Sequence, residues 1–167
     1  MKTITQNILL VAFASFMFFS CATDDSDELS IQNEKIVDIQ LTYTSLESEI
    51  TTLINEYRSF NGLSTLNVMN IVSFEAETHT DYMVQVGEVN HDNFNERYQY
   101  LVANANAKSA SENVAYGYNS AESVVNAWLN SPSHKEIISN PSFTDFGIST
   151  KVDSDGKYYY TNIFIKK

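Results

Sequence analysis

The sequence predicts an α+β sandwich, and three observations lead to this prediction. Several segments between residues 44 and 129 repeat apolar residues at helical spacing. The last quarter of the chain instead alternates apolar and polar residues, as strands do. The chain has 167 residues, of which 43% are hydrophobic and 19% are charged, and these values are typical of one globular domain.

The first two helices are indicated by their ends and by their apolar faces. Thr44 and Glu47 have the spacing of a capping box, in which each side chain bonds the other residue's backbone amide, and Gly62 marks the helix end. The apolar face between them consists of Leu46, Ile50, Leu53, Ile54 and Tyr57. A second helix is expected over residues 68–86, with Gly87 after it. Its core-facing residues are expected to be Ile71, Phe74, Thr78, Tyr82 and Val86.

The remaining elements are shorter. Asn93, with Glu96 three residues on, is expected to begin a helix over residues 94–103. Residues 111–118 have strand character, and residues 120–129 form a helix with the apolar side chains Val124, Val125, Trp128 and Leu129. Residues 146–152 and 158–165 alternate as two strands, and the turn residues 153–156 join them into a hairpin.

The N-terminal region has the composition of a targeting segment. The apolar run of residues 8–19 would rise only about 18 Å as a helix, which is too short to span a bilayer. Ser20 and the single cysteine, Cys21, follow the run and resemble the lipobox of bacterial lipoproteins. We therefore expect a lipoprotein signal peptide at 1–20 with lipidation at Cys21. The alternatives are an uncleaved anchor and a secreted protein with a free thiol.

Residues 21–43 form an acidic linker in this interpretation, and the domain occupies residues 44–167. Four acids fall within residues 24–28. They fit a solvated, extended tether, or a sorting signal of the kind found after the lipidated cysteine in some Gram-negative lipoproteins. The expected location is the cell envelope, with the chain anchored to the outer membrane through its lipid and facing either the periplasm or the outside.

Composition excludes several classes of function. The 21 acids and 10 bases give a formal net charge of −11, and no Lys/Arg cluster provides a nucleic-acid surface. One cysteine excludes an intramolecular disulfide and any CxxC metal site. Neither GxGxxG nor GxxxxGK[ST] is present, so the sequence contains no recognisable nucleotide cradle.

Three histidines are candidates for chemistry. His79 lies within the second helix between Glu77 and Asp81, and the favoured interpretation is a structural histidine bonded to a carboxylate. His91 lies in the loop after that helix. Ser131-Pro132 reads as the start of a short helix, which makes His134 its third residue, near the positive helix end that lowers an imidazole pKa. No local spacing matches HExxH or a zinc ribbon.

Several segments together resemble the CAP superfamily of cysteine-rich secretory, antigen 5 and pathogenesis-related 1 proteins. They are LINEYRSFNGLSTL, SENVAYG and AWLNSPSHKEIISNPSFTDFGI, in this order and within residues 46–165. Within this superfamily, the sequence most resembles the bacterial members that lack disulfides. It implies an α-β-α sandwich with a central three-stranded antiparallel sheet flanked by helices, and a shallow cleft. In many members the cleft contains two His and two Glu, which bind a divalent ion in some.

Matched by position, the two histidines of this set are His91 and His134, and the first glutamate is Glu112. The second glutamate is replaced by Ser131, which cannot supply a charge or a base and whose hydroxyl we expect to cap the helix. Asn113 and Ser131 are expected to support the cleft. The resemblance thus implies a weak Zn²⁺ site at His91, His134 and Glu112, with water as the remaining ligand.

Two functions remain open at this stage. The first is a lipid-anchored, extracytoplasmic binding module without catalysis, which holds a divalent metal and a small apolar or envelope ligand. The second is a metal-assisted hydrolase or protease of the cell envelope, with Glu112 as the base. Ser131 weighs against the hydrolase. Tyr116, Tyr118 and residues 158–160 are expected to be exposed, lining either a cleft or a dimer face.

Overall fold

The computed structural model describes residues 39–167, all of which lie in one compact unit. The expected signal peptide at 1–20, the lipidation site at Cys21 and the expected linker up to residue 38 lie outside the described residues. The end of that linker contacts the domain, because Asn70 donates to the Ile39 carbonyl at 2.8 Å. Within residues 39–167, no helix combines the length and the apolar composition that crossing a membrane requires.

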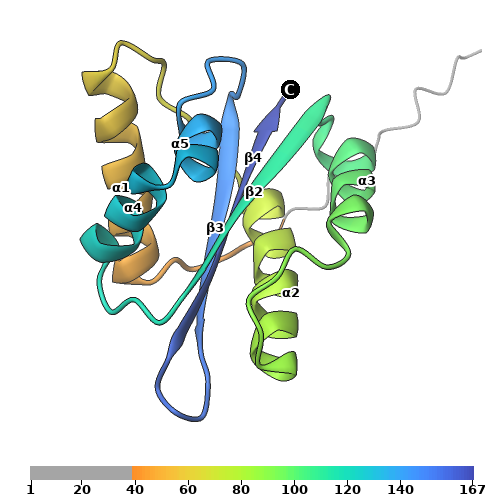
Figure 1. Cartoon of the computed structure of the whole chain (residues 1–167). Coiled ribbons are helices and arrows are strands. Elements are labelled where there is room, and N and C mark those ends of the chain that lie inside the picture. The colour runs from red at the N-terminus through yellow and green to blue at the C-terminus, as the bar shows by residue number, and fades with distance from the viewer. Residues whose placement is uncertain (1–38) are drawn as a thin grey trace, which may run out of the picture. The chain divides into compact units, whose positions relative to one another are not determined.

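Helices and strands are mixed along the described part of the chain, and Figure 1 shows how they are arranged. The helices are α1 (Ser45–Phe60), α2 (Asn70–Val86), α3 (Phe94–Ala105), α4 (Ala121–Asn130) and α5 (Pro132–Ile138). The strands are β1 (Asn67–Val68), β2 (Ser109–Tyr116), β3 (Asp145–Val152) and β4 (Tyr158–Lys166).

The sheet has four strands in the order β1-β3-β4-β2. Strands β2, β3 and β4 are antiparallel and form the predicted three-stranded core, with β4 in the centre. The prediction of three strands was incomplete, because β1 pairs parallel to β3 through Asn67↔Asp145 and Val68↔Phe146. A two-residue strand has no alternation from which a sequence pattern could predict it.

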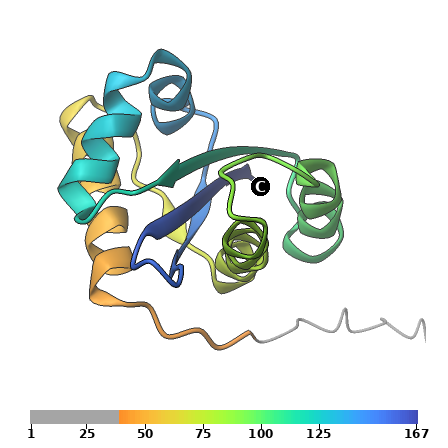
Figure 2. The same ribbon diagram turned by 60° about the horizontal axis from the view of Figure 1, so that its bottom comes forward.

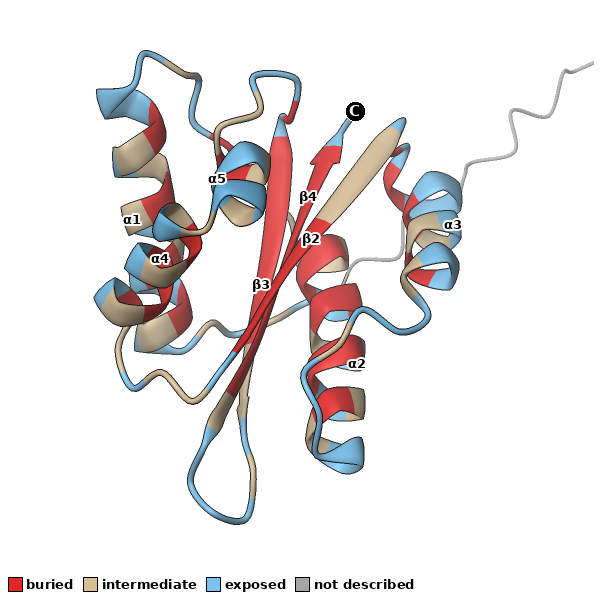
Figure 3. Ribbon diagram, viewed as in Figure 1, coloured by how far each residue is buried: buried red, intermediate tan, exposed pale blue. Residues whose placement is uncertain are grey.

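Helices cover both faces of the sheet, as Figures 1 and 2 show, so the fold is the expected α-β-α sandwich. α1, α4 and α5 pack on one face, over a core that includes Ile50, Val124, Trp128, Ile138, Phe146 and Phe164. α2 and α3 pack on the other face, over Val72, Ala76, Leu101, Ile163 and Ile165. Figure 3 shows this burial on the sheet and on the inward helix faces.

The predicted capping box at the start of α1 is confirmed. Glu47 N donates to the Thr44 hydroxyl at 3.1 Å, and Thr44 N donates to Glu47 Oε2 at 2.8 Å. The other oxygen of Glu47 accepts the backbone N–H of Thr150 at 2.7 Å. The same carboxylate therefore begins α1 and ties it to β3.

The predicted inner face of α2 was wrong in part. Ile71 and Tyr82 pack against the core as predicted. Phe74 and Val86 are 39% and 47% exposed, and Thr78 is also exposed. The buried residues are smaller or polar: Val72, Ser73, Glu75, Ala76, His79, Thr80 and Met83. The reason is the close approach of α2 to the sheet, since a Cβ on Gly147 would lie 2.2 Å from Ser73 N. Small side chains permit that contact, and bulky Phe74 does not.

Candidate functional site

Glu112 on β2 is the centre of a buried polar cluster. Its side chain is 2% exposed, and Arg97 reaches it from α3 with two hydrogen bonds, Nε to Oε2 at 3.0 Å and Nη2 to Oε1 at 2.9 Å. The remaining guanidinium nitrogen, Nη1, donates to the Asp92 carbonyl at 2.6 Å. Arg97 thus pairs with Glu112 in the bidentate geometry that suits guanidinium and carboxylate groups, and it also holds the loop that precedes α3.

His91 lies in that loop and contacts the same carboxylate. Its Nδ1 is 2.8 Å from Glu112 Oε1, and its side chain is 53% exposed. An ionised carboxylate only accepts hydrogen bonds, so Nδ1 is the protonated nitrogen of the neutral ring. Nε2 then has a free lone pair, and the structure gives it no hydrogen-bond partner within residues 39–167. Glu112 therefore sets both the orientation and the tautomer of His91.

His79 lies in the cluster, but the expected hydrogen bond to a carboxylate is replaced by one to a backbone carbonyl. The side chain is fully buried, Nε2 lies 2.8 Å from the Asn90 carbonyl, and Glu112 Oε1 is 3.7 Å away. Burial is the main cause that lowers the pKa of His79, with smaller opposing effects from Glu112 and the Asn90 carbonyl. Neutral His79 donates to Asn90 and fixes the loop next to His91.

His134 is the third residue of α5, as predicted. Burial lowers its pKa, and the nearby His91 lowers it further. The direction agrees with the sequence argument, and burial is the larger cause. Among the hydrogen bonds of residues 39–167, none involves the His134 imidazole, whereas its backbone carbonyl accepts from Asn113 Nδ2 at 3.2 Å. Asn113 is fully buried, and this bond ties α5 to β2.

Ser131 does not cap α5 through its side chain, which corrects the sequence expectation. It occupies the N-cap position, but its hydroxyl lies 3.3 Å from the Ser133 hydroxyl, and no backbone amide of the described residues donates to it. The hydroxyl is therefore not committed to the helix. Replacing Ser131 consequently removes no side-chain cap.

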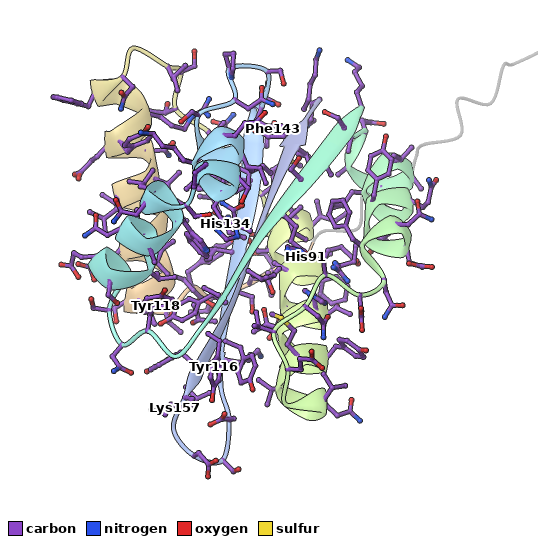
Figure 4. All side chains as sticks on the ribbon, viewed as in Figure 1. His91, Tyr116, Tyr118, His134, Phe143 and Lys157 are labelled. Carbon is purple, nitrogen blue, oxygen red and sulfur yellow. The ribbon has the colours of Figure 1, made fainter. Side chains whose placement is uncertain are left out.

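His91 and His134 both line a cleft of about 510 Å³. Its polar lining consists of Asn90, His91, Ser131 and His134, and its apolar lining includes Val89, Val114, Tyr116, Tyr118 and Trp128. Figure 4 shows His91 and His134 near β2, on the α2–α3 loop and on α5, with Tyr116 and Tyr118 lower in the view. The expectation for residues 158–160 was wrong in part, because Tyr159 and Tyr160 are buried.

Comparison with known proteins identifies the fold family. Residues 51–164 match the CAP model, the cysteine-rich secretory protein family. The chain belongs to the CAP family. It is 29% identical over 143 residues to the uncharacterized membrane protein YlbC of Bacillus subtilis, and the match covers 83% of this chain and 38% of that protein. It is 29% identical over 108 residues to the uncharacterized protein YkwD of the same organism, and this match covers 63% and 42%.

This CAP chain spans about two-fifths of the length of those curated relatives. A solved structure with the same fold is that of an outer surface protein from Borrelia burgdorferi. Its TM-score is 0.66 at 24% identity, and the match covers 75% of this chain and 96% of that one. This likeness confirms the α-β-α fold of the CAP domain.

The donor set does not fit a metal site with three protein ligands. In the part of the chain that the structure describes, no group of three or more His, Cys, Asp or Glu side chains is arranged to hold an ion. The reason lies in Glu112, whose two oxygens already accept hydrogen bonds from Arg97 and His91. The cleft of this CAP domain offers two imidazoles, His91 and His134.

Sequence reasoning missed Arg97, although a signal for it exists. Arg97, Leu101 and Ala105 recur at four-residue spacing and form the buried face of α3. A cation at a position of the buried face requires an acidic partner, because an unpaired buried charge is costly. The choice of Glu112 as that partner depends on the packing of α3 beside β2.

Proposed function

We propose that this CAP domain is a non-catalytic binding module of the cell envelope, whose cleft holds a small apolar or envelope ligand. The observation that supports this best is the hydrogen bonding of Glu112 to both Arg97 and His91. A general base has to reach the proton that it removes within about 2.6–3.2 Å. Glu112 is 2% exposed at its side chain and has both oxygens occupied, so it is a positioning group for His91.

The cleft itself has the properties of a binding site. Its volume of about 510 Å³ falls within the range of roughly 300–1,000 Å³ that is usual for ligand pockets. Apolar and aromatic walls surround a few polar groups, which is the usual composition of such pockets. By the family resemblance, Ser131 stands at the position of the second acid, and the lining within residues 39–167 contains no carboxylate.

A divalent ion would be held by His91 Nε2 and the His134 imidazole, with water completing its coordination. Glu112 would then be the carboxylate that orients a metal-binding histidine. Such an ion supplies Lewis acidity when it is bound. We expect weak Zn²⁺ affinity, because structural and catalytic zinc sites usually have three or four protein ligands.

Zinc titration by calorimetry on the untagged full chain tests this part of the proposal. We expect weak binding that is lost in His91→Ala and His134→Ala. Binding should tighten in Ser131→Glu, which adds the family's acid without removing a side-chain cap. Equal binding by the wild type and both histidine variants would show that the pair does not hold the ion.

The anchored location rests on the N-terminal sequence. The short apolar run followed by Ser20 and Cys21 is typical of a lipoprotein signal. The names of two similar proteins also refer to a membrane or a surface. YlbC is named a membrane protein, and the Borrelia burgdorferi protein is named an outer surface protein. We propose that the lipid on Cys21 holds the domain at the outer membrane, facing the periplasm or the outside.

The main experiment separates binding from catalysis. The full chain and its Glu112→Gln variant are incubated with peptide and ester libraries. A fragment library is screened in parallel by ¹H–¹⁵N NMR for shifts at His91, His134 and the Trp128 indole. We expect no turnover that depends on Glu112, together with fragments that shift the cleft resonances. Turnover that Glu112→Gln abolishes would establish the hydrolase instead.

A further inference from the structure

The cleft is lined without charged side chains, although the chain contains 21 acids and 10 bases. Among the residues that the structure describes, no Asp, Glu, Lys or Arg belongs to the lining. The nearest buried carboxylate, Glu112, is already paired with Arg97. A ligand with a full charge would lose its hydration in the cleft without gaining an ionic partner, so the lining favours an uncharged ligand.

Tyr116 provides a flat aromatic surface at one end of this cleft. It is 44% exposed, and its ring lies 4.6 Å from that of Tyr159, centroid to centroid, at an angle of 52°. Tyr159 is 3% exposed and packs with Met83 and Val114, so it supports the Tyr116 ring from the protein side. Tyr118, which is half-buried, lies in the same lining (Figure 4). A supported, exposed ring is suited to stacking against the apolar face of a ligand.

The polar groups of the lining require a ligand that forms hydrogen bonds. His91 Nε2 is an acceptor, because Nδ1 is protonated toward Glu112. The neutral His134 imidazole adds one donor and one acceptor nitrogen, and the Ser131 hydroxyl can both donate and accept. An acyl chain would cover these groups and leave them unpaired, which is unfavourable. A ligand with hydroxyl groups would satisfy them.

We infer that the ligand of this cleft is an uncharged saccharide, whose pyranose ring stacks on Tyr116 and whose hydroxyls bond His91 and His134. A pyranose ring combines an apolar C–H face with hydroxyls around its edge, and it carries no charge. These are the three properties that the lining selects. The inference rests on the proposed binding function of the same cleft and narrows the class of its ligand.

Calorimetric titration of the full chain with neutral tetrasaccharides tests this inference. The probes are tetra-N-acetylchitotetraose, cellotetraose and maltotetraose, in EDTA to exclude metal effects and in a detergent without a sugar head group. We expect at least one to bind. Tyr116→Ala and Tyr116→Leu should weaken that binding about tenfold, since leucine keeps apolar bulk but lacks a flat face. Tyr116→Phe should bind like the wild type.

Tyr100→Ala is the matched control. Tyr100 is a half-buried tyrosine on α3, outside the cleft lining, where it contacts Phe74. This variant should bind like the wild type, and thermal melting of each variant confirms that it is folded. Saccharide binding that all Tyr116 variants retain would overturn the assigned site.

The uncharged apolar dye N-phenyl-1-naphthylamine separates the two proposals. If the dye shifts Trp128 fluorescence while none of the three tetrasaccharides binds, the saccharide inference is wrong and the binding function stands. If neither the dye nor any tetrasaccharide binds, and the fragment screen finds nothing in the cleft, both proposals fail. A saccharide that binds and competes with the dye supports both.

Discussion

Replacing Arg97 with methionine should destabilise the CAP domain by about 3–5 kcal/mol, the usual effect of removing one partner of a buried ion pair. Methionine has a similar length and no charge, so the change leaves Glu112 buried without its two guanidinium hydrogen bonds. The side chains of Arg97 and Glu112 are 6% and 2% exposed, so water cannot replace the lost partner. Within residues 39–167, only His91 would remain as a polar partner of the carboxylate at hydrogen-bond distance.

Urea unfolding followed by the fluorescence of Trp128 measures this effect, since Trp128 is the single tryptophan and is 1% exposed. The matched control is Lys151→Met. Lys151 pairs with Glu77 where both side chains are 35% exposed, so its loss should cost only about 0–1 kcal/mol. The double variant Arg97→Met/Glu112→Leu should recover much of the loss, because it leaves no unpaired charge.

Two results would refute this reasoning. One is an Arg97→Met cost as small as that of Lys151→Met, which would mean that the pair is hydrated in solution. The other is a double variant whose loss equals the sum of the two single losses, which would mean that Arg97 and Glu112 do not interact.

Three further predictions concern packing, pH and the anchor. Gly147→Ala should destabilise the domain by about 3 kcal/mol or more, because its Cβ would lie 2.2 Å from Ser73 N in α2. Burial lowers the pKa of His79 and His134, so the unfolded chain binds protons first as the pH falls. The contribution of these two neutral histidines to the free energy of unfolding should be fully present above about pH 6.5. It should be lost as the pH falls from there through the lower folded pKa values, and the loss should be smaller in His79→Gln. If Cys21 is lipidated, the chain should partition into detergent with the mass of an acylated protein beginning at residue 21, and Cys21→Ala should not.

Each of these predictions has a measurement that decides it. Wild-type urea midpoints in Gly147→Ala would contradict the close contact between α2 and β3. Identical pH–stability curves for the wild type and His79→Gln, measured by thermal melting between about pH 5 and pH 8, would contradict a neutral, buried His79. Mass spectrometry of native protein with residues 1–20 intact would contradict lipidation.

Much of the fold follows from local patterns. The capping box of α1, the β3–β4 hairpin and the third position of His134 in α5 were all predicted from neighbouring residues. β1 and the buried face of α2 were not predictable in this way. Their positions depend on how closely α2 approaches Gly147 and on backbone pairing with β3, which are tertiary contacts.

The candidate site, like the fold, could be predicted from the sequence only in part. The family resemblance predicted His91, Glu112 and His134 as the site, and of these His91 and His134 line one cleft in the structure. The role of Glu112 could not be predicted from sequence, because it depends on Arg97, fifteen residues away in the chain. Without Arg97, a glutamate at position 112 could be a metal ligand. With Arg97 bound to it, the same glutamate orients His91.

The tautomer of His91 tests the central claim most directly, that Glu112 orients His91 in a binding cleft and does not act as a free base. A long-range ¹H–¹⁵N spectrum of the full chain with labelled histidine, recorded at about pH 8, where a histidine of ordinary pKa is neutral, distinguishes the protonated ring nitrogen from the free one. The account predicts that His91 has its proton on Nδ1, toward Glu112, and that Arg97→Met changes the proportion of this tautomer. A His91 ring protonated on Nε2, or a spectrum that neither Arg97→Met nor Glu112→Gln alters, would contradict it.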